Sequence, residues 1–359
     1  MSFTAQSDAI RITLWLRRLA LVGVLLGFGV VMLGAYVRLT AAGLGCPDWP
    51  GCYGHVTPLG AAHSAALGNI PSATPLDLGK AWREMIHRYA ATTLGLLIVL
   101  ITALVIAARA EVTVRTRYVA VLLGTVVLQG ALGMLTVTWQ LKPLIVTLHL
   151  LFGLTTLALL WWLWLSLRAP GAGNSAERVR ILPGAPHGKR QRLLAGLALG
   201  VLVVQIALGG WTSSNYAAIA CPDFPTCQGS WWPPMDFGDA FVLWRAPSIN
   251  YEGGVLANSA RVAIHFTHRM GALAVTAVLL AAALAVLRER ALRPQHLAAA
   301  AVIAALALQL TIGVSMVVRG FPLWLATAHN GGAALTLLAV VALLHGVYRA
   351  TPSAADAGI

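Results

Sequence analysis

The chain has 359 residues, of which 58% are hydrophobic and 10% are charged, and its mean hydropathy is +0.77. A soluble globular protein carries about 25% charged residues, so this composition excludes an ordinary soluble fold and points to the lipid bilayer. The formal charge of +13 does not indicate a nucleic-acid partner. That partner requires a basic face on a folded soluble domain, and the sequence leaves little room for one.

Eight apolar runs are long enough to cross a bilayer, which takes about 20 residues. The first run is too long for a signal peptide and no small-residue cleavage site follows it, so we expect it to remain as a helix. The predicted fold class is therefore an all-α integral membrane protein with eight transmembrane helices. The eight runs are 19–37, 85–108, 118–138, 143–167, 193–213, 260–287, 297–318 and 322–347.

Lysine and arginine residues indicate the orientation of these helices, because cytoplasmic loops retain them. Sixteen lie in the termini and loops of one side, against six on the other side. We therefore expect both termini in the cytoplasm and two long outer loops, 38–84 and 214–259. The second outer loop is rich in tryptophan and proline, which suits an ordered cap at the membrane surface. The inner segment 169–192 is predicted to be a flexible cytoplasmic linker.

The sequence contains an internal repeat. Residues 33–54 align without gaps on 208–229 at an offset of 175. Each copy holds four helices, an even number, so both copies enter the membrane in the same direction. We predict two tandem, pseudo-twofold-related four-helix bundles, 1–168 and 193–359. Further matches, at offsets of 180 and 181, are Ile86-His87-Arg88 with Thr267-His268-Arg269, Leu128-Gln129 with Leu308-Gln309, Gly133 with Gly313, and His149 with His329.

Four of the ten histidines lie at one depth in the predicted helices, near the outer surface: His87, His149, His268 and His329. An ionisable side chain at this depth is costly and indicates a functional site, with hydrogen bonding between helices as the alternative. Two imidazoles are too few for a zinc site, but they are the axial ligands of a haem iron. Small residues nearby offer space for a flat macrocycle: Gly95, Gly153, Gly271, Gly331 and Gly332. The other histidines receive no role: His55, His63, His187, His296 and His345.

The two repeats differ beside one histidine. Three residues before His87 stands Glu84, one turn away on the same helix face, whereas His265 stands at the equivalent place before His268. A carboxylate beside an iron ligand can accept protons or stabilise positive charge during an oxidation. We therefore expect the first bundle to be catalytic and the second to hold a resident haem.

Arginines directly follow two of the histidines. Arg88 and Arg269 are placed to neutralise haem propionates or to reach lipid headgroups. For Glu84, the alternative to catalysis is an interfacial ion pair with Arg83 or Arg88. The sequence leaves both choices open.

All four cysteines lie in two copies of the pattern Cys-Pro-Asp-aromatic-Pro-x-Cys-x-Gly. Neither copy matches a haem-attachment or zinc signature. On an oxidising outer side, the prolines and the aspartate favour a tight turn that brings the thiols together, so we expect the disulfides Cys46–Cys52 and Cys221–Cys227. A structural staple is one interpretation of the first pair, and a redox cycle during turnover is the other.

The order of these motifs resembles the bacterial haem A synthase family, in its cysteine-containing form. The resemblance covers nearly the whole chain and rests on VRLTAAGLGCPDWPGC, EMIHR, TLHLLFG, CPDFPTC, IHFTHR and TAHNGG. It implies eight helices in two similar bundles, in the bacterial inner membrane, with haem sites toward the outer side. It also implies oxidation of a methyl group of haem O to a formyl group by successive hydroxylations, giving haem A for terminal oxidases.

The resemblance further implies roles for individual residues. Glu84, His87 and His149 match the substrate-haem site, and His268 and His329 match the ligands of a haem b cofactor. His265 adds a second imidazole beside His268 and leaves the choice of ligand on that helix open. The implied substrate, haem O, enters from the lipid bilayer. Association with haem O synthase, with an electron donor and with further copies of the chain also stays open.

Two other function classes remain. A dihaem b-type electron carrier or quinol oxidoreductase needs the histidines without the carboxylate. A transporter needs repeated halves that rock about a central site.

Overall fold

The computed structural model describes residues 3–69, 75–109, 112, 114–167, 189–246 and 249–349, with side chains from residue 8 onward. The predicted linker 169–192 lies largely outside these residues, as does His187.

The described residues form eight helices that are long and apolar enough to cross a membrane, which confirms the predicted all-α, eight-helix fold class. The chain is a multi-pass membrane protein. Large apolar side chains on the outer surfaces of these helices, such as Leu25, Leu96 and Leu273, are largely exposed, as lipid-facing positions require. The helices are α1 (Phe3–Leu39), α3 (Leu78–Ala107), α4 (Thr116–Thr138), α5 (Pro143–Ser166), α6 (Lys189–Ser214), α8 (Asn258–Leu287), α9 (His296–Val318) and α10 (Leu323–Arg349).

Two helices begin well before the predicted runs. Helix α1 starts at Phe3 instead of residue 19, because the charged residues of its first turns lower the hydropathy without interrupting the backbone hydrogen bonds. Helix α3 starts at Leu78 instead of residue 85, where Oδ1 of Asp77 accepts a hydrogen bond from Lys80 N at 2.9 Å and caps the helix. Hydropathy therefore located the membrane crossings correctly but underestimated the length of these two helices, because they continue beyond the apolar layer.

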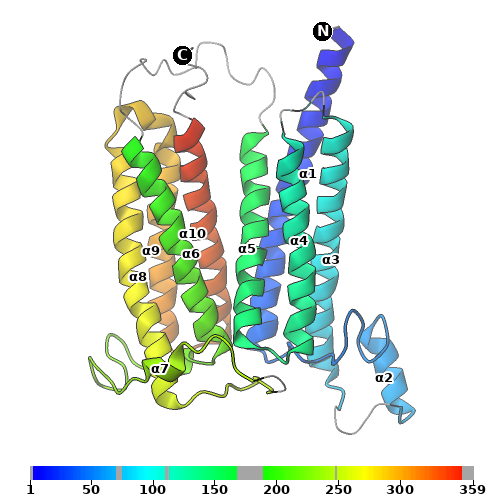
Figure 1. The fold of residues 1–359 in the computed structure, drawn as a ribbon, viewed down its shortest axis with the longest axis vertical. Helices are drawn as coiled ribbons and strands as arrows, with labels where there is room; N and C mark the ends of the chain where they lie inside the picture. The colour runs from blue at the N-terminus through cyan, green and yellow to red at the C-terminus, as the bar shows by residue number, and fades with distance from the viewer. Residues whose placement is uncertain are drawn as a thin grey trace.

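The long loops contain short helices that the sequence did not predict. They are α2 (Pro58–Ala66) and α7 (Phe237–Ala240), with the 3₁₀ turn η1 (Ala218–Ala220). A second 3₁₀ turn, η2 (Arg290–Gln295), lies in the short connection between α8 and α9. Figure 1 places α2 and α7 at one end of the molecule, opposite the end where α1 begins and α10 ends. Both short helices have side-chain N-caps, from Thr57 and from Asp236. A capping residue in a loop is a weak sequence signal for a short helix, which is why these two helices were not predicted from the sequence.

The long helices pack in two groups of four, α1, α3, α4 and α5 in one and α6, α8, α9 and α10 in the other (Figure 1). In the first group α1 and α4 each contact both α3 and α5, so α3 and α5 lie diagonally opposite. In the second group α8 and α10 are diagonal in the same way. The groups meet where α1 contacts α10, α5 contacts α6, and α5 contacts α10.

Hydrogen bonds cross between the two groups, and one of them joins positions that correspond in the repeat. Arg38 Nη2 on α1 donates to the carbonyl of Ser213 on α6 at 2.7 Å, and these residues are 175 positions apart. Near the other end, Trp161 Nε1 on α5 donates to the carbonyl of Leu338 on α10 at 3.0 Å. Buried polar groups in an apolar setting need such partners, so these bonds fix the relative register of the two groups.

Candidate functional site

The structure brings the four histidines together in two pairs. His87 on α3 and His149 on α5 have ring centres 6.5 Å apart, with planes inclined by 79°. His268 on α8 and His329 on α10 repeat this arrangement at 6.5 Å and 77°. Because each pair is carried by diagonal helices, each spans the middle of its four-helix group.

Both pairs have the donor set and the spacing that a haem iron needs. A metal bound by one nitrogen of each ring, at about 2 Å from each, requires ring centres roughly 6 Å apart. Nδ1 of His87, His149 and His329 is buried and lacks a hydrogen-bond partner among the described residues. These rings therefore have unused bonding capacity. Two imidazoles suffice for haem, since the porphyrin supplies the other nitrogens.

Each histidine ring packs against a glycine of a neighbouring helix. A Cβ on Gly34 would lie 2.9 Å from Cε1 of His87, and a Cβ on Gly209 would lie 3.2 Å from Cε1 of His268. Any larger residue would displace these rings, so the glycines define where the imidazoles lie. In the same way, a Cβ on Gly133 would lie 3.2 Å from Cε1 of His149, and a Cβ on Gly313 would lie 3.0 Å from Cε1 of His329.

Sequence reasoning had singled out different glycines. Gly271 and Gly332 pack against glutamine amides, and a Cβ on Gly95 would meet nothing within 4 Å. The signal that identifies the four contacting glycines is the repeat itself, because it aligns Gly34 with Gly209 and Gly133 with Gly313.

Glutamines are the polar neighbours of the histidines, and sequence reasoning gave them no role. Nε2 of Gln129 lies 3.4 Å from Nε2 of His149. The matching contact in the second group joins Gln309 and His329 at 3.3 Å. A third glutamine, Gln205 on α6, lies 3.1 Å from Nδ1 of His268 and has no counterpart in the first group.

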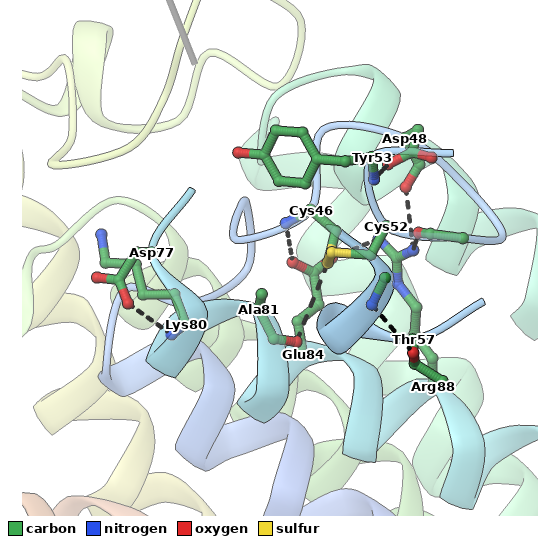
Figure 2. Close-up of a disulfide and its surroundings, with 12 residues drawn as sticks. Cys46, Asp48, Cys52, Tyr53, Thr57, Asp77, Lys80, Ala81, Glu84 and Arg88 are labelled. Atoms are coloured by element: carbon green, nitrogen blue, oxygen red, sulfur yellow. Dashed lines mark hydrogen bonds and ion pairs between the residues drawn. A yellow bond between two sulfur atoms is a disulfide. The ribbon is translucent and has the colours of Figure 1, made fainter. Parts of the chain in front are cut away.

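Glu84 is buried near the N-terminus of α3 and interacts with Cys46 and Arg88 (Figure 2). Oε2 accepts a hydrogen bond from the backbone N–H of Cys46 at 2.9 Å. Oε1 forms an ion pair of 2.5 Å with Nη2 of Arg88, one turn further along the helix. The Arg88 pairing that the sequence left as an alternative is therefore present. The hydrogen bond from Cys46 to Glu84 ties the helix that carries His87 to the first cysteine loop.

The side chain of Arg88 also contacts that loop. Its Nη1 donates to the carbonyls of Asp48 at 3.0 Å and Gly51 at 2.6 Å. In the second group, Arg269 donates to the carbonyls of Asp223 at 2.8 Å and Thr226 at 2.7 Å. Both guanidinium groups therefore bind the backbone of a cysteine loop.

His265 occupies the place of Glu84 in the second group. It is buried, and its Nε2 accepts a hydrogen bond from Nε of Arg269 at 3.3 Å. The two groups thus share the arginine anchor and the loop, and they differ in the group beside the arginine: a carboxylate in the first, an imidazole in the second.

Both predicted disulfides are present, Cys46–Cys52 and Cys221–Cys227. All four cysteines are buried, so the sulfur atoms are shielded from solvent. In the second loop, Asp223 accepts hydrogen bonds from the side chain of Thr226 and from the backbone N–H groups of Gln228 and Gly229. The Thr226 hydroxyl, followed by the backbone groups, holds the pKa of Asp223 below its ordinary value.

The loop between α6 and α8 contacts the first group of helices. Lys142, at the turn between α4 and α5, is buried, and its Nζ donates to the carbonyl of Arg245 at 3.0 Å. The same ammonium lies 3.4 Å from the ring centre of Trp244. An ion pair of 3.6 Å joins Lys80 to Glu252. The ordered cap expected from tryptophan and proline therefore covers both groups.

Three of the histidines without a predicted role have hydrogen-bond partners, two of them within nine residues in the chain and one, that of His345, in the other group of helices. His55 is bonded to the hydroxyl of Ser64 at 2.7 Å, His296 to the carbonyl of Glu289 at 3.3 Å, and His345 to the hydroxyl of Ser166 at 3.1 Å.

The fold and these sites define a multi-pass helical membrane protein with two repeated histidine pairs. The chain belongs to the COX15-CtaA family of cytochrome oxidase assembly proteins, whose family model matches residues 17–341. It is 42% identical over 332 residues to a protein named Heme A synthase from Shewanella oneidensis, covering 92% of this chain and 94% of that protein. A Heme A synthase from Novosphingobium aromaticivorans is 30% identical over 95% of this chain and 96% of its own length. One from Rhizorhabdus wittichii is 26% identical over 92% of each chain.

Proposed function

We propose that this chain is a haem A synthase, a membrane oxidoreductase that converts a methyl group of haem O to a formyl group through successive hydroxylations. The family membership and the names of the relatives support this reaction. The product, haem A, would serve terminal oxidases. Haem O is an apolar substrate, so lateral entry from the bilayer fits the membrane fold.

Within this proposal, His87 and His149 of the first group would hold the substrate haem, and His268 and His329 of the second group would hold haem b. The observation that carries the allocation is that the ring geometry is the same in both groups while a carboxylate, Glu84, stands one helix turn before His87 and an imidazole, His265, stands one turn before His268. When bound, haem b supplies a one-electron redox centre. Domains 1–168 and 193–359 would then share one architecture but have different functions. The two domains would be related by a pseudo-twofold axis along the membrane normal.

Glu84 is proposed to take up protons released as the methyl group is oxidised. The N–H of Cys46 and the guanidinium of Arg88 each occupy one acceptor site on its two oxygens, and a carboxylate has about four such sites. The remaining lone pairs keep the carboxylate able to receive a proton, while its two partners hold it in place. The fixed partners make Glu84 a preorganised base rather than a mobile side chain.

Arg88 and Arg269 serve the cysteine loops through their backbone contacts. Contacts between these arginines and haem propionates stay a proposal. A guanidinium has five N–H groups, so each arginine has donors left beyond those that already bind the loop.

The orientation, with both termini in the cytoplasm and the histidine pairs toward the outer side of the inner membrane, rests on the distribution of lysine and arginine. Haem O synthase, an electron donor and further copies of the chain are proposed partners.

The experiment that tests the reaction is co-expression with a haem O synthase in a host that makes no haem A, followed by pigment extraction and chromatography. The proposal predicts haem b and haem A in the purified protein. Haem b with haem O left unconverted would favour the dihaem electron carrier or quinol oxidoreductase. A protein without any haem would favour the transporter.

A further inference from the structure

A cavity of about 320 Å³ lies between α6 and α8, at the end of the molecule where α1 begins and α10 ends (Figure 1). This volume is at the lower end of the range for ligand pockets, about 300–1,000 Å³. The lining residues belong to the first turns of α6 and to the last turns of α8 with the two residues that follow it. Leu284, which lines the cavity, is 39% exposed, so the cavity opens on the lipid-facing surface of these helices.

The cavity is basic where the two helices end. Arg190 lies in the first turn of α6, and Arg288 directly follows the last residue of α8. Both arginines are exposed, and neither has an ion-pair partner among the residues that the structure describes. Glu289 also lines the cavity, so its charged groups are two cations and one anion. The net charge of the lining is therefore positive.

The cavity is apolar toward the middle of the membrane. Leu194 lies one turn beyond Arg190 on α6, and Leu284 lies one turn before Arg288 on α8. Helices rise 1.5 Å per residue, so these leucines lie about 6 Å deeper than the arginines. The lining thus changes from charged to apolar along the helix axes, as a phospholipid does from its phosphate to its acyl chains.

The first group differs at the matched positions of the repeat. Where the second group has the two arginines, the first group has an indole and a methyl group, and where the second has two alanines, the first has two leucines. Leucine is larger than alanine, so the alanines leave room that leucines would occupy. With the offset of 175 for α6 and 181 for α8, the matched positions are Trp15 for Arg190, Ala107 for Arg288, Leu100 for Ala281 and Leu104 for Ala285.

This chemistry fits an anionic lipid of the surrounding bilayer. The planar fork of an arginine binds phosphate oxygens in pairs, and basic pockets between transmembrane helices bind anionic lipid headgroups. A zwitterionic headgroup would bring its own cation to the arginines, so the positive lining favours an anionic one.

We propose that the cavity binds one anionic phospholipid, whose phosphate lies between Arg190 and Arg288 and one of whose acyl chains lies along Leu194 and Leu284. The lipid would join α6 to α8 on the side of the membrane opposite the histidine pairs. The inference is independent of the proposed function, because it uses no residue of those pairs.

The test is titration of the purified, delipidated full-length protein with single phospholipids, followed by native mass spectrometry. Dioleoylphosphatidylglycerol should bind more tightly than dioleoylphosphatidylcholine, which has the same chains and a zwitterionic headgroup. Arg190→Gln combined with Arg288→Gln should weaken phosphatidylglycerol binding about 30-fold, since each arginine near a membrane surface contributes about 5-fold. The matched control, Arg17→Gln combined with Arg18→Gln, removes the same charge at the same end of the first group and should leave the affinity unchanged.

A second variant separates the cavity from the surface charge. Ala285→Leu introduces the side chain that Leu104 provides in the first group and leaves both arginines in place. It should weaken phosphatidylglycerol binding to the level of phosphatidylcholine. In vesicles of phosphatidylglycerol, a photoreactive p-benzoylphenylalanine introduced at Ala281 should crosslink to the lipid.

Four outcomes overturn the inference. Equal affinity for the two lipids, or equal weakening in the Arg17 and Arg18 control, would show that the arginines of the cavity do not select the headgroup. Unchanged binding by Ala285→Leu would show that the lipid binds outside the cavity. Inorganic phosphate that binds as tightly as the lipid would indicate a site for a free anion. A crosslink from position 281 to residues 169–188 would show that the chain's own linker occupies the cavity.

Discussion

The carboxylate of Glu84 and the guanidinium of Arg88 form an ion pair of 2.5 Å in which the two side chains are only 5% and 13% exposed. The pair joins the helix that bears His87 to the cysteine loop, because Arg88 also holds loop carbonyls and Glu84 holds the N–H of Cys46. Breaking a buried pair by removing one partner is costly, since it leaves an unpaired charge.

Arg88→Ala should therefore destabilise the first cysteine loop, by about 3–5 kcal/mol. The Cys46–Cys52 disulfide should then become reducible by a soluble phosphine, which mass spectrometry after thiol alkylation would detect. Arg83→Ala, five residues earlier on α3, is the control and should leave the disulfide protected. Equal protection in both variants would mean that Arg88 does not shield the loop.

A wild-type disulfide that changes redox state during turnover would favour the redox interpretation over the structural staple.

Gly34→Ala and Gly209→Ala should each disturb one site only. A Cβ at these positions would lie 2.9 Å and 3.2 Å from the neighbouring histidine ring, and overpacking of this kind costs about 1–3 kcal/mol. Gly34→Ala should lower haem A formation with haem b retained, and Gly209→Ala should lower haem b occupancy. Pigment extraction measures both.

The same helices provide matched controls for the glycine variants. A Cβ on Gly29 of α1 or on Gly200 of α6 would meet nothing within 4 Å, so alanine there should change neither pigment. Loss of haem b in Gly34→Ala but not in Gly209→Ala would reverse the allocation of the two groups.

Lys142→Met should release the second outer loop from the first group. The buried ammonium stacks on Trp244 and donates to the carbonyl of Arg245, and a desolvated cation–π contact is worth about 2 kcal/mol. Lys80→Met is the matched control, because it removes a pair with Glu252 that is about one-third exposed and worth about 1 kcal/mol or less. Protease added to intact spheroplasts should cleave the Lys142 variant faster than the Lys80 variant. Equal rates would contradict the anchoring role of Lys142.

Reporter fusions test the predicted orientation. A reporter active only outside the cytoplasm should be inactive at the C-terminus and active when inserted at His63, in the first outer loop. The reverse pattern would contradict the orientation inferred from sixteen basic residues against six.

The sequence predicts most of the fold because each crossing needs its own apolar run. It also predicts the disulfides, since each cysteine pair lies within one short motif, and it identifies the histidines, because their depth and spacing repeat. The matching geometry of His87 with His149 and of His268 with His329 follows from the same repeat.

Other features could not be predicted, because they depend on contacts between distant segments. Gln205 lies 63 residues from His268, and Lys142 lies 103 residues from Arg245. No local pattern pairs such positions. The early start of α1 was missed for another reason: hydropathy measures the apolar layer and not the length of the helix.

The central claim is that the protein has two haem sites and that one carboxylate, Glu84, is catalytic. The most direct test is pigment analysis of the Glu84→Gln variant, co-expressed with a haem O synthase. Glutamine keeps the size of the side chain and an acceptor for the Cys46 N–H, and it removes the base. The protein should retain haem b, accumulate haem O and contain no haem A, whereas His265→Gln should still form haem A. Haem A at the wild-type level in Glu84→Gln would contradict the catalytic assignment.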